Sequence, residues 1–173
     1  MTGTAPAWLD DTEMRAWRGL VTVVQLLPLA LDRQLQREAG LSHAYYMVLA
    51  MLSESPGRSM RMSALAAQTA TSQSRLSHSV ARLEERGWVQ RRRCADDGRG
   101  QVAVLTDAGL AALAGAAPGH VAEVRRQVFD HLTDAQVRAL GDVASTLAGA
   151  LQEQVCPTTR TAAPEGEPCP SSA

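Results

Sequence analysis

The chain has 173 residues and contains no lysine, so arginine supplies all 17 of its basic residues. Aromatic residues make up only 3% of the sequence, whereas alanine and leucine are abundant, and this composition favours helices. Residues 1–11 lack a basic segment followed by an apolar one, so no signal peptide is expected. The longest apolar stretch, residues 21–31, is interrupted by Gln25 and Pro28 and is too short to span a membrane. We therefore expect a cytoplasmic protein without a membrane partner.

Cysteine is also scarce, and no motif typical of catalysis is present. No pair of the 3 cysteines has the spacing of a zinc site, and a disulfide framework is not expected. No serine or cysteine stands in a recognisable motif with a base and an orienting acid, and there is no phosphate-binding glycine loop. Asp96 and Asp97 are adjacent carboxylates, but in a turn both would be solvated. The sequence thus predicts no enzyme, no cofactor and no metal site.

Residues 58–105 contain the most informative pattern, which predicts a helix, a tight turn, a second helix and a β-hairpin. In the second helix, residues 72–86, the apolar residues Leu76, Val80 and Leu83 recur at helical spacing and share one face. The opposite face and its flanks carry Ser74, His78, Ala81, Arg75, Ser77 and Arg82. One face is therefore expected to pack, while the other offers hydrogen-bonding groups bordered by cations.

The segment that follows predicts a wing of two strands. Gly87 ends the helix, and residues 88–92 alternate between large apolar and polar side chains. Residues 96–100 have the composition of a turn, and Val102, Val104 and Leu105 supply the returning strand. This hairpin displays Arg91, Arg92, Arg93 and Arg99, which it could lay against phosphates.

Charge is divided unevenly along the chain. Residues 58–99 hold nine arginines and four acids, a net charge of 9 − 4 = +5. The remainder holds eight arginines and fourteen acids, a net charge of 8 − 14 = −6, and the two values sum to −1. A nearly neutral chain therefore joins a basic module to an acidic one, as expected when a single surface meets a polyanion such as DNA.

Three segments in this order resemble the MarR family of bacterial transcription regulators. They are residues 72–91 (SQSRLSHSVARLEERGWVQR), 97–101 (DGRGQ) and 104–109 (VLTDAG), within a resemblance that extends from about residue 10 to 152. The resemblance implies a homodimer of winged helix-turn-helix subunits that binds a pseudo-palindromic operator in double-stranded DNA. Such proteins are usually repressors that a small molecule releases. No cofactor is implied.

The resemblance also assigns roles to individual residues. It places residues 72–82 in the major groove and Arg99 in a neighbouring minor groove, with Asp97 orienting the guanidinium. A plain turn residue is the alternative interpretation of Asp97. The expected DNA contacts are Ser72, Gln73, Ser74, Arg75, Ser77, His78, Arg82, Arg91, Arg93, Asp97 and Arg99.

In this family the ligand pocket commonly lies between the dimerisation helices and the winged domain. The expected lining residues are Trp17, Arg18, His43, Tyr45 and Tyr46, which would suit a planar aromatic or phenolic anion. Alternatively, Trp17 and Tyr46 are ordinary core or interface residues.

Helices are expected on both sides of the basic module. A first helix spans residues 10–39 and ends at Gly40, with Pro28 kinking or splitting it. Ser42 is expected to cap a second helix that ends near residue 53, and Ser63 a third that ends near Gln68. The apolar stripe of the first helix is Leu20, Val24, Leu27, Leu31 and Leu35.

Helical periodicity resumes at Asp107, with a second kink expected at Pro118. Thr133 and Gln136 form a capping box for a last helix that ends near Gln152. The stripe of the first of these helices is Leu110, Leu113, Ala117, Val121, Val124 and Val128. That of the second is Val137, Leu140, Ala144, Leu147 and Leu151.

We therefore predict a mainly α fold with a small β-hairpin wing. Its parts are a flexible N-terminus (1–9), a dimerisation helix (10–39), a winged helix-turn-helix domain (40–106), further dimerisation helices (107–152) and a disordered tail (153–173). The outer apolar stripes would pack against a second copy, or alternatively would cover the middle domain. Three less favoured hypotheses are a helical scaffold protein that does not read DNA, a metal pair of His120 with His131, and a thiol switch at Cys94.

Overall fold

The longest helix, α1 (Asp11–Ala39), is capped at both ends in the computed structural model, which describes residues 7–93 and 100–155. The Asp10 carboxylate accepts the backbone N–H groups of Thr12 and Glu13, each at 2.8 Å, and the Glu13 carboxylate accepts that of Asp10. Gly40 ends the helix with a φ of 59°, a left-handed conformation that suits glycine. The predicted split at Pro28 is wrong, because α1 is one continuous helix in which proline removes a single backbone donor.

Three shorter helices follow: α2 (His43–Glu54), α3 (Met62–Gln68) and α4 (Gln73–Glu85). As predicted, the Ser42 hydroxyl accepts the Tyr45 N–H. The Ser72 hydroxyl accepts the Arg75 N–H in the same way, a cap that sequence analysis did not predict. The predicted cap at Ser63 is wrong. The N-cap of the third helix is Arg61, two residues before Ser63 and at the end of a short strand, and it makes no side-chain capping bond.

The sheet has three antiparallel strands in the order β1-β3-β2. The two predicted wing strands are β2 (Val89–Arg93) and β3 (Gln101–Leu105), in which Arg91 lies opposite Ala103. A strand that the sequence did not predict, β1 (Ser59–Arg61), follows the 3₁₀ turn η1 (Pro56–Arg58) and pairs with the other edge of β3. The turn between β2 and β3 lies outside the described residues.

The core lies between α2, α3, α4 and one face of this sheet. The predicted inner face of α4 is confirmed, because Leu76, Val80 and Leu83 are at most 1% exposed. They pack in one cluster with Leu35, Leu41, Leu49, Leu52, Leu65, Val89 and Ala103. This burial fixes the opposite face of α4 toward the outside.

Two further helices complete the chain, α5 (Asp107–Gln127) and α6 (Asp134–Val155), joined through the 3₁₀ turn η2 (Phe129–His131). The predicted Thr133–Gln136 capping box is present, and α6 ends three residues beyond the predicted end. Pro118, where a kink was predicted, lies inside α5, and the helix runs through it without a break. The predicted stripe of α5 is also partly wrong, since Val121 is 55% exposed and the inner face is formed by Gly109, Leu113, Ala116, His120 and Glu123.

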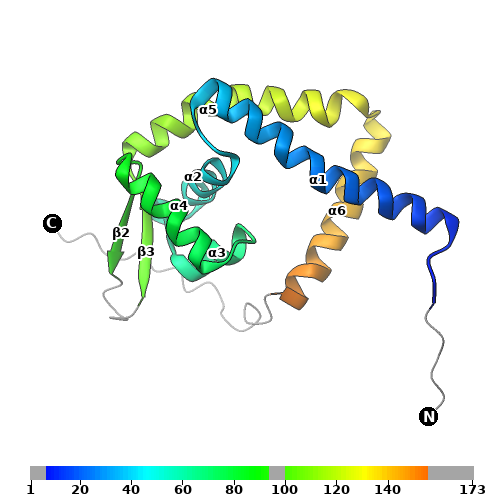
Figure 1. Cartoon of the computed structure of the whole chain (residues 1–173), viewed down its shortest axis with the longest axis horizontal. Helices are drawn as coiled ribbons and strands as arrows, with labels where there is room; N and C mark the ends of the chain where they lie inside the picture. The colour runs from blue at the N-terminus through cyan, green and yellow to red at the C-terminus, as the bar shows by residue number, and fades with distance from the viewer. Residues whose placement is uncertain (1–6, 94–99, 156–173) are drawn as a thin grey trace, which may run out of the picture.

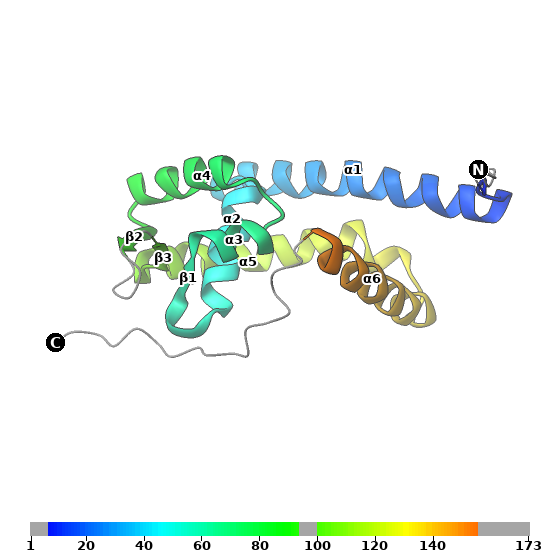
Figure 2. The ribbon, with the colours of Figure 1, turned by 90° about the horizontal axis from the view of Figure 1, so that it is seen from below.

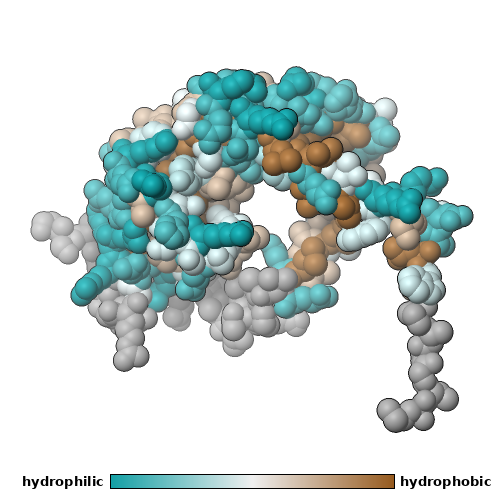
Figure 3. Space-filling view, viewed as in Figure 1, coloured by the Kyte–Doolittle hydropathy of each residue, from teal (hydrophilic) through white to brown (hydrophobic). Residues whose placement is uncertain are grey.

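The winged-helix elements gather at one end of the molecule, and α1, α5 and α6 extend from them toward the other (Figures 1 and 2). The inner part of α1 packs against α5. Hydrophobic side chains are visible on the surface of α6 and of the neighbouring helices (Figure 3). Within the described ranges, no helix has the length and apolar character needed to cross a membrane.

Candidate nucleic-acid interface

The outer face of α4 presents a continuous set of polar groups. Ser72, Gln73, Ser74, Arg75 and His78 are all exposed. They occupy the N-terminal half of the helix, where backbone N–H groups also point outward and favour anions. Arg82, one turn further on, is exposed and pairs with Glu85 at 2.8 Å. An exposed pair of this kind is weak, so Arg82 can exchange the carboxylate for another anion at little cost.

Arg91 and Ser77 hold the wing against α4. The Glu84 carboxylate accepts the Arg91 backbone N–H at 2.7 Å and its Nε–H at 2.6 Å. The Nη1 of Arg91 also donates to the Ser77 hydroxyl at 3.4 Å. The ion pair is mostly buried, since the side chain of Arg91 is 26% exposed and that of Glu84 is 30% exposed. The first wing strand is therefore tied to the middle of α4 by charge-assisted bonds.

Further along β2, Arg92 and Arg93 are exposed. The Arg92 guanidinium donates to the Gln90 side chain at 3.4 Å. Together with Arg75 and Arg82, these residues give the surface four exposed arginines. Asp97 and Arg99, which were also predicted to contact DNA, lie outside the described residues.

Arg86 joins this surface to the long helix, a role that sequence analysis missed. Its guanidinium lies 5.0 Å from the ring centroid of Trp88 and 6.0 Å from that of Tyr45. Its Nη1 donates to the carbonyl of Gly40, the residue that ends α1, at 3.1 Å. Cation–π contacts and a hydrogen bond thus connect the end of α4 to both α1 and α2. No local signal reveals such a contact, because Gly40 and Arg86 are 46 residues apart.

Of the predicted ligand-pocket residues, the structure brings together His43 and Tyr46, and it adds His120 of α5. The ring centroids of Tyr46 and His120 are 4.2 Å apart, and those of His43 and His120 are 5.9 Å apart. Burial lowers the pKa of His120, and the neighbouring His43 lowers it further. Burial also lowers the pKa of His43, partly offset by Asp32. Both rings therefore favour the neutral form.

Two buried polar atoms near this cluster have no hydrogen-bond partner. They are Oε1 of Gln34 on α1 and Nδ1 of His120 on α5. The Gln34 side-chain amide donates to Glu38 at 2.7 Å, and a Cβ built on Gly119 would touch both of these α1 side chains. Unsatisfied buried groups are costly, so these atoms mark where a polar ligand or water would be stabilised.

The other predicted pocket residues lie elsewhere. Trp17 and Arg18 are exposed on the outer half of α1. They lie about 22 Å along the helix from Asp32, whose carboxylate accepts the His43 N–H. Tyr45 contacts Arg86 instead. His131 is exposed on η2, and the described parts of the chain contain no group of three or more ligating residues that could hold a metal ion.

Comparisons with known proteins agree with this geometry. A model of the MarR family matches residues 39–100. Sco3205, a MarR family transcriptional regulator from Streptomyces coelicolor whose structure was solved in complex with DNA, is 49% identical with a TM-score of 0.80, over 87% of this chain and 94% of that one. AbsC, a MarR family regulator from the same organism, is 44% identical with a TM-score of 0.72, over 83% and 99%.

CouR from Rhodococcus jostii RHA1, solved bound to p-coumaroyl-CoA, is 25% identical with a TM-score of 0.67, over 83% of this chain and 96% of that one. No match was found among curated proteins. The order of the elements and the near-50% identity to Sco3205 over most of both chains lead to one conclusion. The chain belongs to the MarR family of transcriptional regulators, which are DNA-binding proteins and not enzymes.

Proposed function

We propose that the protein is a homodimeric repressor that binds a pseudo-palindromic operator through α4 and the wing. The observation that carries this proposal is the arrangement of α4, which has one fully buried face and an opposite face of exposed polar groups beside the arginines of β2. The structure of Sco3205 with DNA supports it. Action on chromosomal DNA would place the protein in the bacterial cytoplasm.

The exposed residues of α4 divide into two proposed roles. Ser74 and His78, at the centre of the outer face, would contact base edges in the major groove. Ser72, Gln73, Arg75, Arg82 and Arg93 would contact phosphates or the groove margin. Ser77 and Arg91 would act mainly by holding the wing in place, since both are partly buried in contacts with α4 and β2. Roles for Asp97 and Arg99 remain predictions from the family resemblance.

Exposed apolar side chains on the outer helices support the dimer. In α1 they are Trp17, Leu20, Val23, Val24, Leu26 and Leu29, and in α6 they are Leu140, Val143, Leu147 and Leu151. Every described side chain of α6 except Val137 is exposed, so this helix does not cover the middle domain, as the alternative required. An apolar surface of this extent is typical of a protein interface, and a second copy is the occupant that we propose.

We place the effector site at the cluster of His43, Tyr46 and His120. A planar aromatic or phenolic compound would stack on these rings, and its polar group would satisfy Gln34 Oε1 or His120 Nδ1. The p-coumaroyl group of the CouR ligand is a phenolic example within the family. Trp17 and Arg18 would join such a site only from the second copy, given their distance along α1.

DNA binding can be tested with operators selected from random sequence. Affinity should fall steeply with salt, because on the order of 6 or more phosphates are contacted. His78→Ala should relax base preference and cost roughly 1 to 3 kcal/mol at the affected position. Arg93→Ala should instead weaken binding to all sequences and reduce the salt slope by about 1. Arg15→Ala, an exposed site on the outer half of α1, is the matched control and should change neither.

If both variants bound like the wild type, the proposed placement of α4 and β2 on DNA would be wrong. Binding that is indifferent to salt and sequence would favour the scaffold hypothesis. A thermal-shift screen of aromatic acids tests the effector site. A stabilising compound should lose its effect in His120→Phe, which removes the Nδ1 atom, and keep it in His131→Gln.

A further inference from the structure

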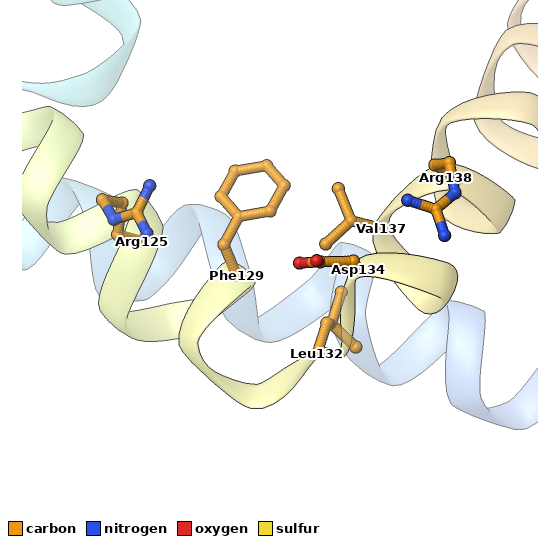
Figure 4. A pocket seen from close by; sticks show the side chains of 6 residues that line it. All are labelled: Arg125, Phe129, Leu132, Asp134, Val137 and Arg138. Atoms are coloured by element: carbon orange, nitrogen blue, oxygen red, sulfur yellow. The ribbon is translucent and has the colours of Figure 1, made fainter.

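The corner where α5 turns into α6 contains an open hollow of about 420 Å³. Its lining is Arg125, Phe129, Leu132, Asp134, Val137 and Arg138. Phe129 and Val137 project into the same space, and the two arginines stand on either side of it (Figure 4). The lining therefore combines three apolar side chains with two arginines and one aspartate, and the hollow lies at the opposite end of α5 from the wing (Figure 1).

Charged side chains surround the hollow, and one arginine among them lacks an ion-pair partner in the described part of the chain. Arg125 is 3.8 Å from Asp130, an exposed and weak pair. Asp134 is the first residue of α6, where its charge is favoured by the helix N-terminus. Arg138 forms no ion pair with any residue that the structure describes. Arg138, next to the apolar side chains of Phe129, Leu132 and Val137, is therefore the group that favours an incoming apolar residue with a carboxylate beside it.

The segment just before and at the start of α1 has the complementary chemistry. Trp8 is 87% exposed and Leu9 is 47% exposed, which are large exposed areas for such side chains. Asp10, Asp11 and Glu13 follow them. Asp10 and Glu13 bond to each other's backbone in the capping box, so Asp11 is the carboxylate left to face another molecule. The indole ring of Trp8 and the carboxylate of Asp11 thus lie close together in sequence, and both match the chemistry of the hollow.

We propose that the hollow of one subunit receives Trp8 and Leu9 of the second copy, with the second copy's Asp11 facing Arg138. The inference rests on the dimer proposed above and specifies one of its contacts, which twofold symmetry would repeat. The chain does not fill its own hollow, because Trp8 is almost fully exposed and the start of α1 extends beyond α6 in both ribbon views (Figures 1 and 2). Arg125 and Arg138 would hold the indole through cation–π contacts.

A charge swap tests both the contact and its occurrence between chains. Arg138→Glu and Asp11→Arg, made in separate chains, each place like charges together in a homodimer. In a mixed dimer, the new glutamate at position 138 of one chain faces the new arginine at position 11 of the other. The second, symmetry-related contact keeps the wild-type pair of Arg138 and Asp11. Differently tagged chains, mixed and examined by native mass spectrometry, should therefore form mixed dimers above the statistical share. Arg92→Glu, exposed on β2, replaces Arg138→Glu in the control mixture and should give statistical pairing with Asp11→Arg.

Trp8→Ala gives an independent measurement. Because Trp8 packs on little in its own subunit, the variant should fold normally, while the dissociation constant of the dimer should rise roughly tenfold or more. Statistical pairing in both mixtures, or an unchanged dissociation constant, would overturn this inference while leaving the dimer intact. A wild-type chain that stays monomeric at micromolar concentration would overturn the dimer and the inference together.

Discussion

Gly109, near the start of α5, is the position where adding a methyl group should damage the fold most specifically. A Cβ there would lie 2.1 Å from the carbonyl oxygen of Trp88 and 2.8 Å from Cδ1 of Leu105. The same carbonyl accepts the Thr106 N–H at 3.0 Å, and the Thr106 hydroxyl donates to the carbonyl of Gly87 at 2.7 Å. The backbone N–H and the side-chain hydroxyl of Thr106 therefore both fasten this end of α5 to the segment that joins α4 to the wing.

The cost of Gly109→Ala follows from these contacts. The methyl group meets backbone atoms that cannot rotate away, so overpacking costs about 1 to 3 kcal/mol. A displaced helix start would also weaken the Thr106 hydrogen bond, which contributes about 0.5 to 1.5 kcal/mol. The higher helix propensity of alanine returns about 1 kcal/mol. We expect a net loss of about 0.5 to 3.5 kcal/mol in the free energy of unfolding.

Equilibrium urea unfolding at a fixed protomer concentration measures this loss. Gly115→Ala is the matched control, because Gly115 lies in the same helix and a Cβ there meets nothing within 4 Å. That variant should gain about 0.5 to 1 kcal/mol. The reasoning is refuted if Gly109→Ala is as stable as Gly115→Ala.

Three further predictions concern the links around α4 and the buried histidine. Arg86→Lys should lower the free energy of unfolding by about 1 kcal/mol in urea, because lysine loses the planar stacking on two rings. Glu84→Gln should weaken operator binding more than it weakens folding, since it loosens the wing, and equal losses in gel-shift and urea assays would contradict this. Burial lowers the pKa of His120 below 6.5, so the unfolded chain binds protons first, and this contribution to stability is complete above pH 6.5 and is lost as the pH falls through the lowered pKa. His120→Phe should reduce that loss in thermal melts, and the exposed His131→Gln should not.

Local patterns predicted the parts of the protein that depend on neighbouring residues. The inner face of α4 follows from the spacing of Leu76, Val80 and Leu83, because a helix with one apolar stripe has a single way to pack. The caps at Ser42 and Thr133 are likewise determined within one helical turn. The difference in net charge between residues 58–99 and the rest of the chain follows directly from counting the arginines and acids in each.

Contacts between distant segments account for what the sequence did not predict. Strand β1 has three residues and exists because β3 offers it an edge more than 40 residues later in the chain. Helix α5 carries apolar residues on two faces, and periodicity alone could not decide that Ala116 faces inward while Val121 stays exposed. The sequence analysis grouped His43 with Tyr46 but missed His120, because this residue lies on α5, 74 to 77 residues away in sequence.

The Glu84–Arg91 pair has a consequence for how an effector would act. Two hydrogen bonds connect strand β2 to the last turns of α4. In a DNA complex, α4 and the wing of each subunit would therefore keep a constant distance from each other. Effector binding would then change the distance and angle between the two DNA-binding units of a dimer, while each unit of α4 and wing keeps its own structure. The hinge for that motion would lie at the contact between Arg86 and Gly40, the residue that ends α1. A compound bound between the helices near this contact would need to change only this one contact in each subunit.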